Sequence, residues 1–382
     1  MLLGVLIALP ALGTDFFVPA LPRLAETLSV DVATAQFTLT TYFAGLGAGM
    51  LIWGPVSDRY GRKPVLLVGL ATMLAASLMA TCVDSAGAVA VARLAQGLAM
   101  ASGAVIGRAV VRDLHAHEQA ARLLARMTMV FSVVPLTAPI IGALISVSAG
   151  WRAIFWCFAA VGAVLIVATS LGLRETAPSE RSSVHPADVM RTWLHILADP
   201  RFIAPFFLVL CAHVGILAWV SSSAFVLVRG YGIEPAGYGL AFGAVMLGQI
   251  FGAWTSSRLV VRLGIPRLLR LGTTTMLAAG ASAAVLAWSG VTHWAGVVVP
   301  FLGFLFGSAL TVPNAMAAAI SPFPASAGAA VSLVGAAGFG VGAVISTALG
   351  AAFDGSARPM TTLAAVGGVG AFILNRWKAS RR

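Results

Sequence analysis

The stretch Gly54-Pro-Val-Ser-Asp-Arg-Tyr-Gly-Arg-Lys-Pro64 is a short charged segment between two long apolar ones. Residues 32–57, which overlap its start, and residues 65–83 contain no Asp, Glu, Lys or Arg. A membrane-spanning helix needs about 20 apolar residues, so each flank is long enough to cross a bilayer. The segment therefore predicts a tight turn between two spans, in which Gly54 and Gly61 allow close backbone approach and unusual dihedral angles. Its charged residues are Asp58, Arg59, Arg62 and Lys63.

The composition of the whole chain also indicates a membrane protein. Hydrophobic residues make up 59% of the 382 residues and charged residues only 10%, whereas soluble domains contain about 25% charged residues. Residues 271–353 contain no Asp, Glu, Lys or Arg. As one helix they would extend over more than about 120 Å, so they must fold back several times across a hydrocarbon core of about 30 Å.

The positions of the basic residues indicate a role in membrane orientation, not in binding nucleic acid. The net charge of +11 suggests nucleic acid at first, but the basic residues lie in short loops between apolar stretches, where they set topology. We therefore expect no nucleic-acid partner. The three cysteines also lie in apolar stretches and form no disulfide or metal-binding pattern.

Apolar stretches predict twelve spans. If both termini are cytoplasmic, 19 of the 24 basic residues lie in inside segments and four in outside segments. This asymmetry predicts a multi-pass protein of the cell inner membrane with both termini in the cytoplasm. The first span begins almost at Met1, without a basic flank before it. A cleaved signal peptide would need such a flank. The other interpretation is that translation starts upstream of Met1. The expected spans are 2–22, 34–53, 65–83, 86–108, 127–148, 153–173, 202–226, 236–257, 269–288, 295–319, 325–350 and 359–376.

The chain is expected to consist of two halves. The polar stretch 175–201 predicts a cytoplasmic linker between six-helix halves at 1–174 and 202–382. Residues 257–267 follow the eighth span as 54–64 follow the second, with the acid missing. We therefore expect an all-α membrane protein of 12 transmembrane helices, whose two halves have the pseudo-two-fold symmetry of secondary transporters.

Two charged residues lie inside expected spans. Asp15 lies about seven residues before the outer end of the first span, and Arg93 about seven residues after the outer start of the fourth. Both are therefore roughly 10 Å below the outer face. An intramembrane charge is costly and indicates function. The alternatives are a static ion pair between them, or outward snorkelling of Arg93.

The charged turn, with the order G-x-x-x-D-R-x-G-R-K-P, closely resembles the loop between the second and third spans of the major facilitator superfamily of secondary transporters. Residues 15–22 and 93–97 resemble motifs of its drug:proton antiporters, particularly the bicyclomycin/chloramphenicol-resistance branch. Residues 108–113 and 150–155 also fit that branch. Pro135, Pro139 and Gly142 resemble its antiporter motif in the fifth span, although Ala138 replaces the usual glycine. The resemblance covers about residues 10–176; the second half fits by hydropathy alone.

This resemblance implies roles for particular residues. Asp15 and Arg93 would couple transport to protons. Arg62 would pair with Asp113, while Asp58 would lie near the start of the eleventh span, where a helix N-terminus attracts an anion. Together with Gly54, Arg59 and Gly61, these residues would hold the two halves together when the carrier faces outward. The alternative is that the turn is an ordinary basic loop that only sets membrane topology. By themselves, the two prolines and the glycine of the fifth span would mark no more than a kink.

Further residues in spans are candidates for a substrate cavity. Hydrogen bonding between helices explains the polar side chains as well as a substrate cavity does, and contact with lipid explains the aromatic ones equally well. His213 is more simply a packing residue than a proton relay. The candidates are Gln36, Tyr42, Gln96, Trp219, Gln249, Asn314 and Phe339.

These observations favour one class of function. An ATP-driven pump is disfavoured because no G-x-x-x-x-G-K-[ST] motif occurs, and a membrane enzyme because no paired catalytic groups lie in the spans. We expect a monomeric transporter that exports small, largely apolar drugs from the cytoplasm in exchange for protons by alternating access. It would use the proton gradient and no cofactor, and its partners would be substrate, protons and lipid. The alternatives are a sugar or metabolite exporter and, more distantly, a polytopic enzyme.

Overall fold

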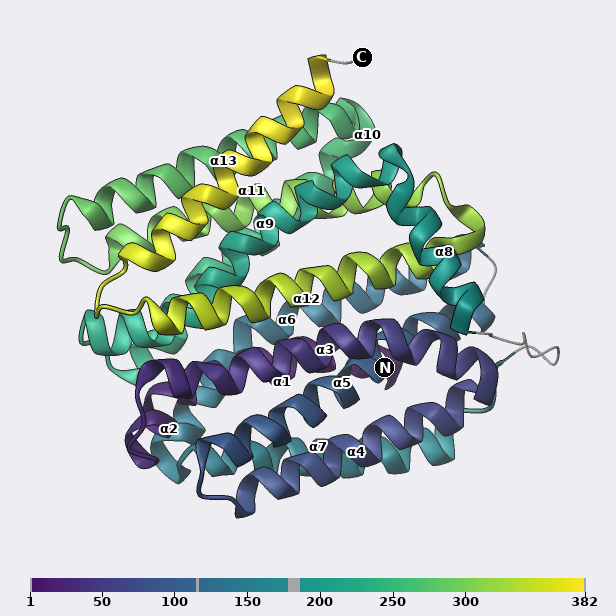
Figure 1. Cartoon of the computed structure of the whole chain (residues 1–382), viewed down its shortest axis with the longest axis horizontal. Helices are drawn as coiled ribbons and strands as arrows, with labels where there is room; N and C mark the ends of the chain where they lie inside the picture. The colour runs from purple at the N-terminus through teal and green to yellow at the C-terminus, as the bar shows by residue number, and fades with distance from the viewer. Residues whose placement is uncertain (1, 115–116, 178–185, 381–382) are drawn as a thin grey trace. The chain divides into compact units, whose positions relative to one another are not determined.

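The computed structural model describes residues 2–114, 117–177 and 186–380, and within these ranges it contains helices and no β-strand. The chain divides into two compact units, Met1–Trp193 and Leu194–Arg382. Figure 1 shows that each unit consists of long helices lying side by side. The division falls inside the expected linker, residues 175–201.

The first unit begins with an interrupted helix. The predicted span over 2–22 corresponds to one candidate span, Leu2–Thr27, but it is not a single regular helix: α1 ends at Asp15, a short 3-10 turn follows, and α2 continues to Thr27. Pro19 and Pro22 have no backbone N–H and cannot continue the helical hydrogen-bond pattern. The elements of this unit are α1 (Leu2–Asp15), η1 (Val18–Ala20), α2 (Leu21–Thr27), α3 (Val32–Tyr60), α4 (Arg62–Cys82), α5 (Ala86–Leu114), α6 (His117–Ala149) and α7 (Trp151–Gly172).

The second unit contains one very long helical element, α10, which Gly264 divides. Gly264 has φ 72°, so α10 comprises two spans that meet at a turn. The other elements are α9 (Pro200–Ala224), the π-helical turn η2 (Phe225–Gly230), α10 (Pro235–Trp288), α11 (Ala295–Ile320), η3 (Pro324–Ser326), α12 (Ala327–Ala351) and α13 (Arg358–Ser380). A further helix, α8 (Pro186–Ala198), lies within the expected linker and was not predicted.

The helices confirm twelve spans. By length and apolar composition, nine helices among the described residues are able to cross a membrane. The helix α10 counts once in this number although it contains two spans, and α6 and α13 complete the set. Large apolar side chains on the outer faces support contact with lipid: Leu171 is 83% exposed and Val344 70%.

An internal repeat relates the two units. At Gly45 of α3, an added Cβ would lie 2.2 Å from the Leu94 carbonyl oxygen of α5, and at Gly248 of α10 it would lie 2.1 Å from that of Leu302 in α11. The turns also correspond, because Gly61 has φ 102° and Gly264 has φ 72°. The second unit therefore keeps the geometry of the charged turn, although it lacks the acid.

Candidate functional site

Asp15 is the last residue of α1, immediately before the break in the first span. Its side chain is 6% exposed. Among the residues that the structure describes, no ion pair or hydrogen bond engages its carboxylate. The break thus holds a buried acid that no cation contacts within the described part of the chain.

Arg93 is fully buried in α5 and is held from several sides. Its Nη2 donates to the Gly13 carbonyl oxygen (3.0 Å) and its Nη1 to Gln96 Oε1 (2.5 Å). The guanidinium carbon lies 4.3 Å from the ring centroid of Phe17 and 3.9 Å from that of Tyr42. These contacts are cation–π interactions, which strengthen when the partners are desolvated. The arginine is therefore rigidly positioned between α1 and α3.

The structure excludes both alternative interpretations of Arg93. It does not snorkel outward, because its side chain is 0% exposed. It also forms no ion pair with Asp15 in the described part of the chain; its contact on α1 is Gly13, two residues earlier. Arg93 therefore binds the segment that carries Asp15 without contacting its carboxylate, and the similar depth of the two charged residues stays a prediction.

The aromatic and amide neighbours of Arg93 are themselves anchored. The Tyr42 hydroxyl donates to the Pro10 carbonyl oxygen (2.9 Å), which ties α3 to α1. Gln96 accepts from Arg93 and donates from Nε2 to Ser77 Oγ of α4 (2.8 Å). Both side chains are 0% exposed. The structure thus places these cavity candidates in hydrogen bonds between helices.

The residues of α6 that resemble an antiporter motif meet the break beside Asp15. Pro135 and Pro139 lie inside α6. At Gly142, an added Cβ would lie 2.2 Å from the Phe16 carbonyl oxygen. Only a residue without a side chain lets α6 pack so closely on the residue that follows Asp15.

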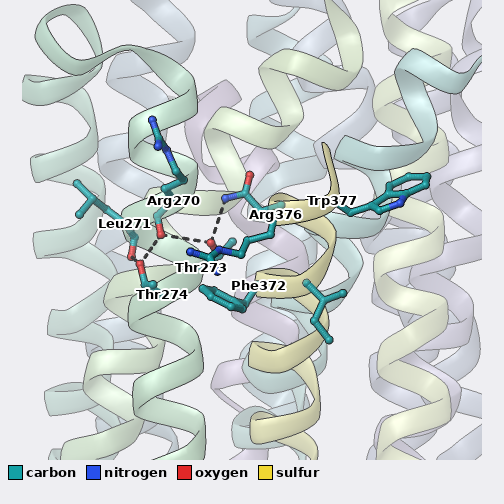
Figure 2. A pocket seen from close by; sticks show the side chains of 9 residues that line it. Arg270, Leu271, Thr273, Thr274, Phe372, Arg376 and Trp377 are labelled. Carbon is teal, nitrogen blue, oxygen red and sulfur yellow. Dashed lines mark hydrogen bonds between the residues drawn. The ribbon is translucent and has the colours of Figure 1, made fainter. Parts of the chain in front are cut away.

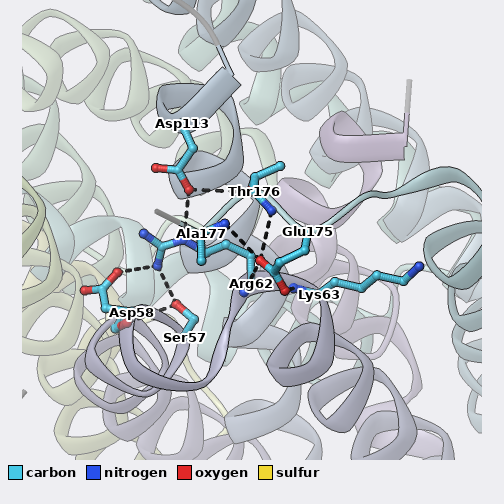
Figure 3. A network of polar contacts seen from close by, with 9 residues as sticks. Ser57, Asp58, Arg62, Lys63, Asp113, Glu175, Thr176 and Ala177 are labelled. Carbon is cyan, nitrogen blue, oxygen red and sulfur yellow. Dashed lines mark hydrogen bonds and ion pairs between the residues drawn. The ribbon is translucent and has the colours of Figure 1, made fainter. Parts of the chain in front are cut away.

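A second polar cluster surrounds Arg62, the first residue of α4 (Figure 3). Its Nε donates to Asp113 Oδ2 (3.0 Å) and its Nη1 to Ser57 Oγ (2.7 Å). It also forms an ion pair with Asp58. The pair of Arg62 with Asp113 is the one that the resemblance implied, and it joins the α3–α4 turn to the end of α5.

Glu175 completes this cluster and was missed by the sequence analysis. Its Oε1 accepts from the Arg62 backbone N–H (2.8 Å) and its Oε2 from that of Lys63 (3.2 Å). Partial burial raises the pKa of Glu175, but the backbone N–H groups of Ala177, Arg62, Thr176 and Lys63 outweigh it and hold the pKa below its ordinary value. The carboxylate therefore caps the positive N-terminus of α4. The only sequence signal was an acid soon after the sixth span.

Residues 3–347 match the family model described as the Major Facilitator Superfamily. The chain belongs to this superfamily. It is 29% identical to a bicyclomycin resistance protein homolog of Haemophilus influenzae, over 94% of this chain and 90% of that one. It is 28% identical to multidrug resistance protein D of Escherichia coli, over 95% and 92%. A crystal structure of the D-xylose-proton symporter has the same fold, with TM-score 0.75 and 14% identity over 98% of this chain and 96% of that one.

In the second unit of this facilitator, aromatic packing replaces the buried charge. Because Leu302 corresponds to Leu94 in the repeat, Phe301 corresponds to Arg93. Phe301 packs on Trp219, with ring centroids 5.0 Å apart, and Trp219 also packs on Phe242 at 5.9 Å. The two units of the facilitator thus share a scaffold, and among the described residues the second unit has no buried arginine at the position that corresponds to Arg93.

The remaining cavity candidates are placed as follows. Gln249 accepts from Ser308 Oγ (3.2 Å), and Asn314 donates to Ser256 Oγ (2.9 Å), so both bind neighbouring helices. His213 donates from Nδ1 to the Val209 carbonyl oxygen of its own helix (2.8 Å). Gln36 is buried and Phe339 half-buried. A role of these residues in substrate binding stays a prediction.

Of the two glycines, Gly61 has the expected unusual dihedral angle, with φ 102°, and the Glu175 side chain lies close to it, whereas the close approach expected at Gly54 is wrong. Gly54 lies within α3, and an added Cβ there would contact only Val105, at 3.8 Å. Arg59, the other residue of the turn with a predicted role in the gate, forms no ion pair in the described ranges. Its guanidinium lies over the ring of Tyr60, 5.3 Å from the ring centroid, and its role stays a prediction.

Gly61→Ala is expected to destabilise the protein more than Gly264→Ala. Both substitutions place a side chain at positive φ, at a cost of roughly 1–2 kcal/mol. At Gly61 the new Cβ would also lie 2.6 Å from Glu175 Oε2, whereas at Gly264 the nearest atom is 3.7 Å away. Glu175 can move only by giving up its bonds to the start of α4. Thermal unfolding in detergent measures both variants, and equal shifts would show that the Glu175 contact adds nothing.

Proposed function

We propose that this transporter exports small, largely apolar compounds from the cytoplasm in exchange for protons by alternating access. The observation that carries the proposal is Asp15, a buried carboxylate at a break in the first span, with no ion pair among the residues that the structure describes. The names of the relatives, which refer to resistance to bicyclomycin and to multiple drugs, favour drugs as the substrate class.

In this proposal, Asp15 carries the proton and Arg93 fixes its surroundings. A carboxylate without a contacting cation changes its protonation state more readily than one locked in a salt bridge. Two hydrogen bonds and two aromatic rings hold the Arg93 guanidinium in a fixed position. Proton binding from outside and substrate binding from the cytoplasm would compete, so that the inward proton gradient drives export.

We further propose that the charged turn contributes to the gate. The side chain of Asp58 is 43% exposed and is engaged by Arg62 alone in the described part of the chain. It is thus available for a contact that breaks and reforms as the carrier cycles. We also propose a cytoplasmic linker over 175–201 between halves at 1–174 and 202–382, both termini in the cytoplasm, and a monomer in the cell inner membrane.

The test is drug transport in proteoliposomes with and without an imposed pH gradient. Asp15→Asn is expected to abolish transport driven by the gradient, because an amide cannot release a proton, while drug binding survives. Asp31→Asn is the matched control: Asp31 caps α3 through the Thr34 N–H (2.8 Å), and asparagine caps a helix equally well. It should transport normally.

Two results would contradict the proposal. Full dependence on the pH gradient in Asp15→Asn, at normal protein level, would remove Asp15 from proton coupling. Transport of sugars or metabolites instead of apolar drugs by the unmodified protein would replace the substrate class.

A further inference from the structure

The second unit contains a hollow of about 790 Å³ between the start of the second span of α10 and the end of α13. An adjoining hollow of about 830 Å³ shares Arg270 and Asn375 and adds Arg201. Figure 2 shows that Arg270, on α10, and Arg376, on α13, come from neighbouring helices, with Thr273 between them. The transport mechanism uses none of these residues.

The hollow has a polar floor and apolar walls. Asn375 is 8% exposed and donates from Nδ2 to Thr273 Oγ1 (3.2 Å). On the outer side, Leu271 is 48% exposed and Ile373 59%. A ligand that fits this arrangement is polar at one end and apolar at the other.

The charge of the hollow is positive and uncompensated. Arg270 and Arg376 form no ion pair within the described ranges, and Arg376 lies over the ring of Phe372 at 5.3 Å. Asp199, close to the hollows, is already bound by Arg201 (2.8 Å). The other acids of this unit, Glu234 and Asp354, lie before the opposite ends of α10 and α13.

We propose that this hollow binds the headgroup of an anionic phospholipid. The phosphate would lie between Arg270 and Arg376, and the acyl chains would follow Leu271 and Ile373. Trp377 lines the same hollow, at the end of a span where tryptophan is enriched at the membrane interface. The basic residues around the turn at Gly264 assign this end of the unit to the cytoplasmic leaflet, where anionic lipids attract basic side chains. The apolar walls favour a lipid over free phosphate.

The test compares lipids that differ only in headgroup. Purified protein in detergent is titrated with phosphatidylglycerol or phosphatidylethanolamine of identical acyl chains, and bound lipid is counted by native mass spectrometry. We expect the unmodified protein to prefer phosphatidylglycerol. Arg270→Gln combined with Arg376→Gln should reduce that preference about tenfold, and the double lysine variant should largely retain it because it keeps both charges.

The matched control removes two arginines on the same side of the unit. Arg258→Gln with Arg262→Gln takes away the same charge from residues that line neither hollow, and should keep the preference. If both glutamine double variants lost the preference for phosphatidylglycerol equally, the effect would come from overall charge and the proposed site would be wrong. A lack of headgroup preference in the unmodified protein would also contradict the site. Displacement of the lipid by inorganic phosphate at equal concentration would show a free-anion site instead.

Discussion

Arg93→Ala is expected to abolish transport, and Arg93→Lys to impair it strongly. Alanine leaves the Gln96 side-chain oxygen and the Gly13 carbonyl oxygen without their donor in a fully buried position, each at a cost of roughly 1–3 kcal/mol. Lysine keeps the charge but lacks the planar fork that reaches both acceptors between two rings. Drug transport driven by a pH gradient, at equal amounts of reconstituted protein, measures the effect.

Arg152→Ala provides the control for this result. Arg152 also lies over an aromatic ring, 4.3 Å from the centroid of Trp151, and it pairs with Asp84. Its side chain is 31% exposed, however, and such pairs contribute about 0–1 kcal/mol. Near-normal transport is therefore expected. If Arg93→Ala also transported normally, the buried arginine would have no role in the cycle. A normal unfolding temperature in Arg93→Lys together with an altered pH profile would separate proton coupling from stability.

The membrane spans could be predicted because charge marks their ends. The turn at Gly61 follows from four charged residues between two uncharged stretches, and its counterpart at Gly264 from arginines at similar spacing, without the acid. The break after Asp15 could not be placed in this way. Pro19 and Pro22 signal an interruption, but α1 already ends before both of them. The helix α8 was missed because its polar residues resemble those of a linker.

The sequence identified the charged residues of the candidate site, but it did not predict which groups Arg93 and Glu175 contact. Costly intramembrane charges identified Asp15 and Arg93, yet nothing in the sequence shows that Arg93 binds the Gly13 carbonyl oxygen rather than the Asp15 carboxylate. The cap formed by Glu175 on α4 joins residues more than a hundred positions apart. Such contacts depend on how the helices pack, which periodicity and hydropathy do not specify.

The buried charge in the first unit and the aromatic stack in the second suggest a division of labour. Arg93 and Phe301 take corresponding positions on α5 and α11, and each packs against an aromatic ring. A protonatable group needs a defined charge nearby, whereas an apolar substrate gains from rings such as Trp219. This asymmetry agrees with the proposal that proton handling belongs to the first unit.

Gly142→Ala is expected to disable the transporter through the backbone beside Asp15. The new Cβ would lie 2.2 Å from the Phe16 carbonyl oxygen and 3.0 Å from its carbon. Both atoms belong to the backbone and cannot turn aside, so α6 must move away from the break. Overpacking of this kind costs roughly 1–3 kcal/mol. Because the displaced segment adjoins the proposed proton carrier, we expect at least about a tenfold loss of gradient-driven transport, a loss that exceeds the fall in stability.

Gly162→Ala separates this contact from the general effect of replacing a helix glycine. Gly162 lies inside α7, and its added Cβ would be 3.5 Å from Leu74, an ordinary van der Waals distance. There alanine should raise stability by about 0.5–1 kcal/mol, because glycine is the poorer helix former. Thermal unfolding and transport are measured for both variants. If Gly142→Ala matched Gly162→Ala in both measurements, close packing of α6 on Phe16 would not be needed. A transport defect in Gly142→Ala alone would tie the antiporter motif to the break that carries Asp15.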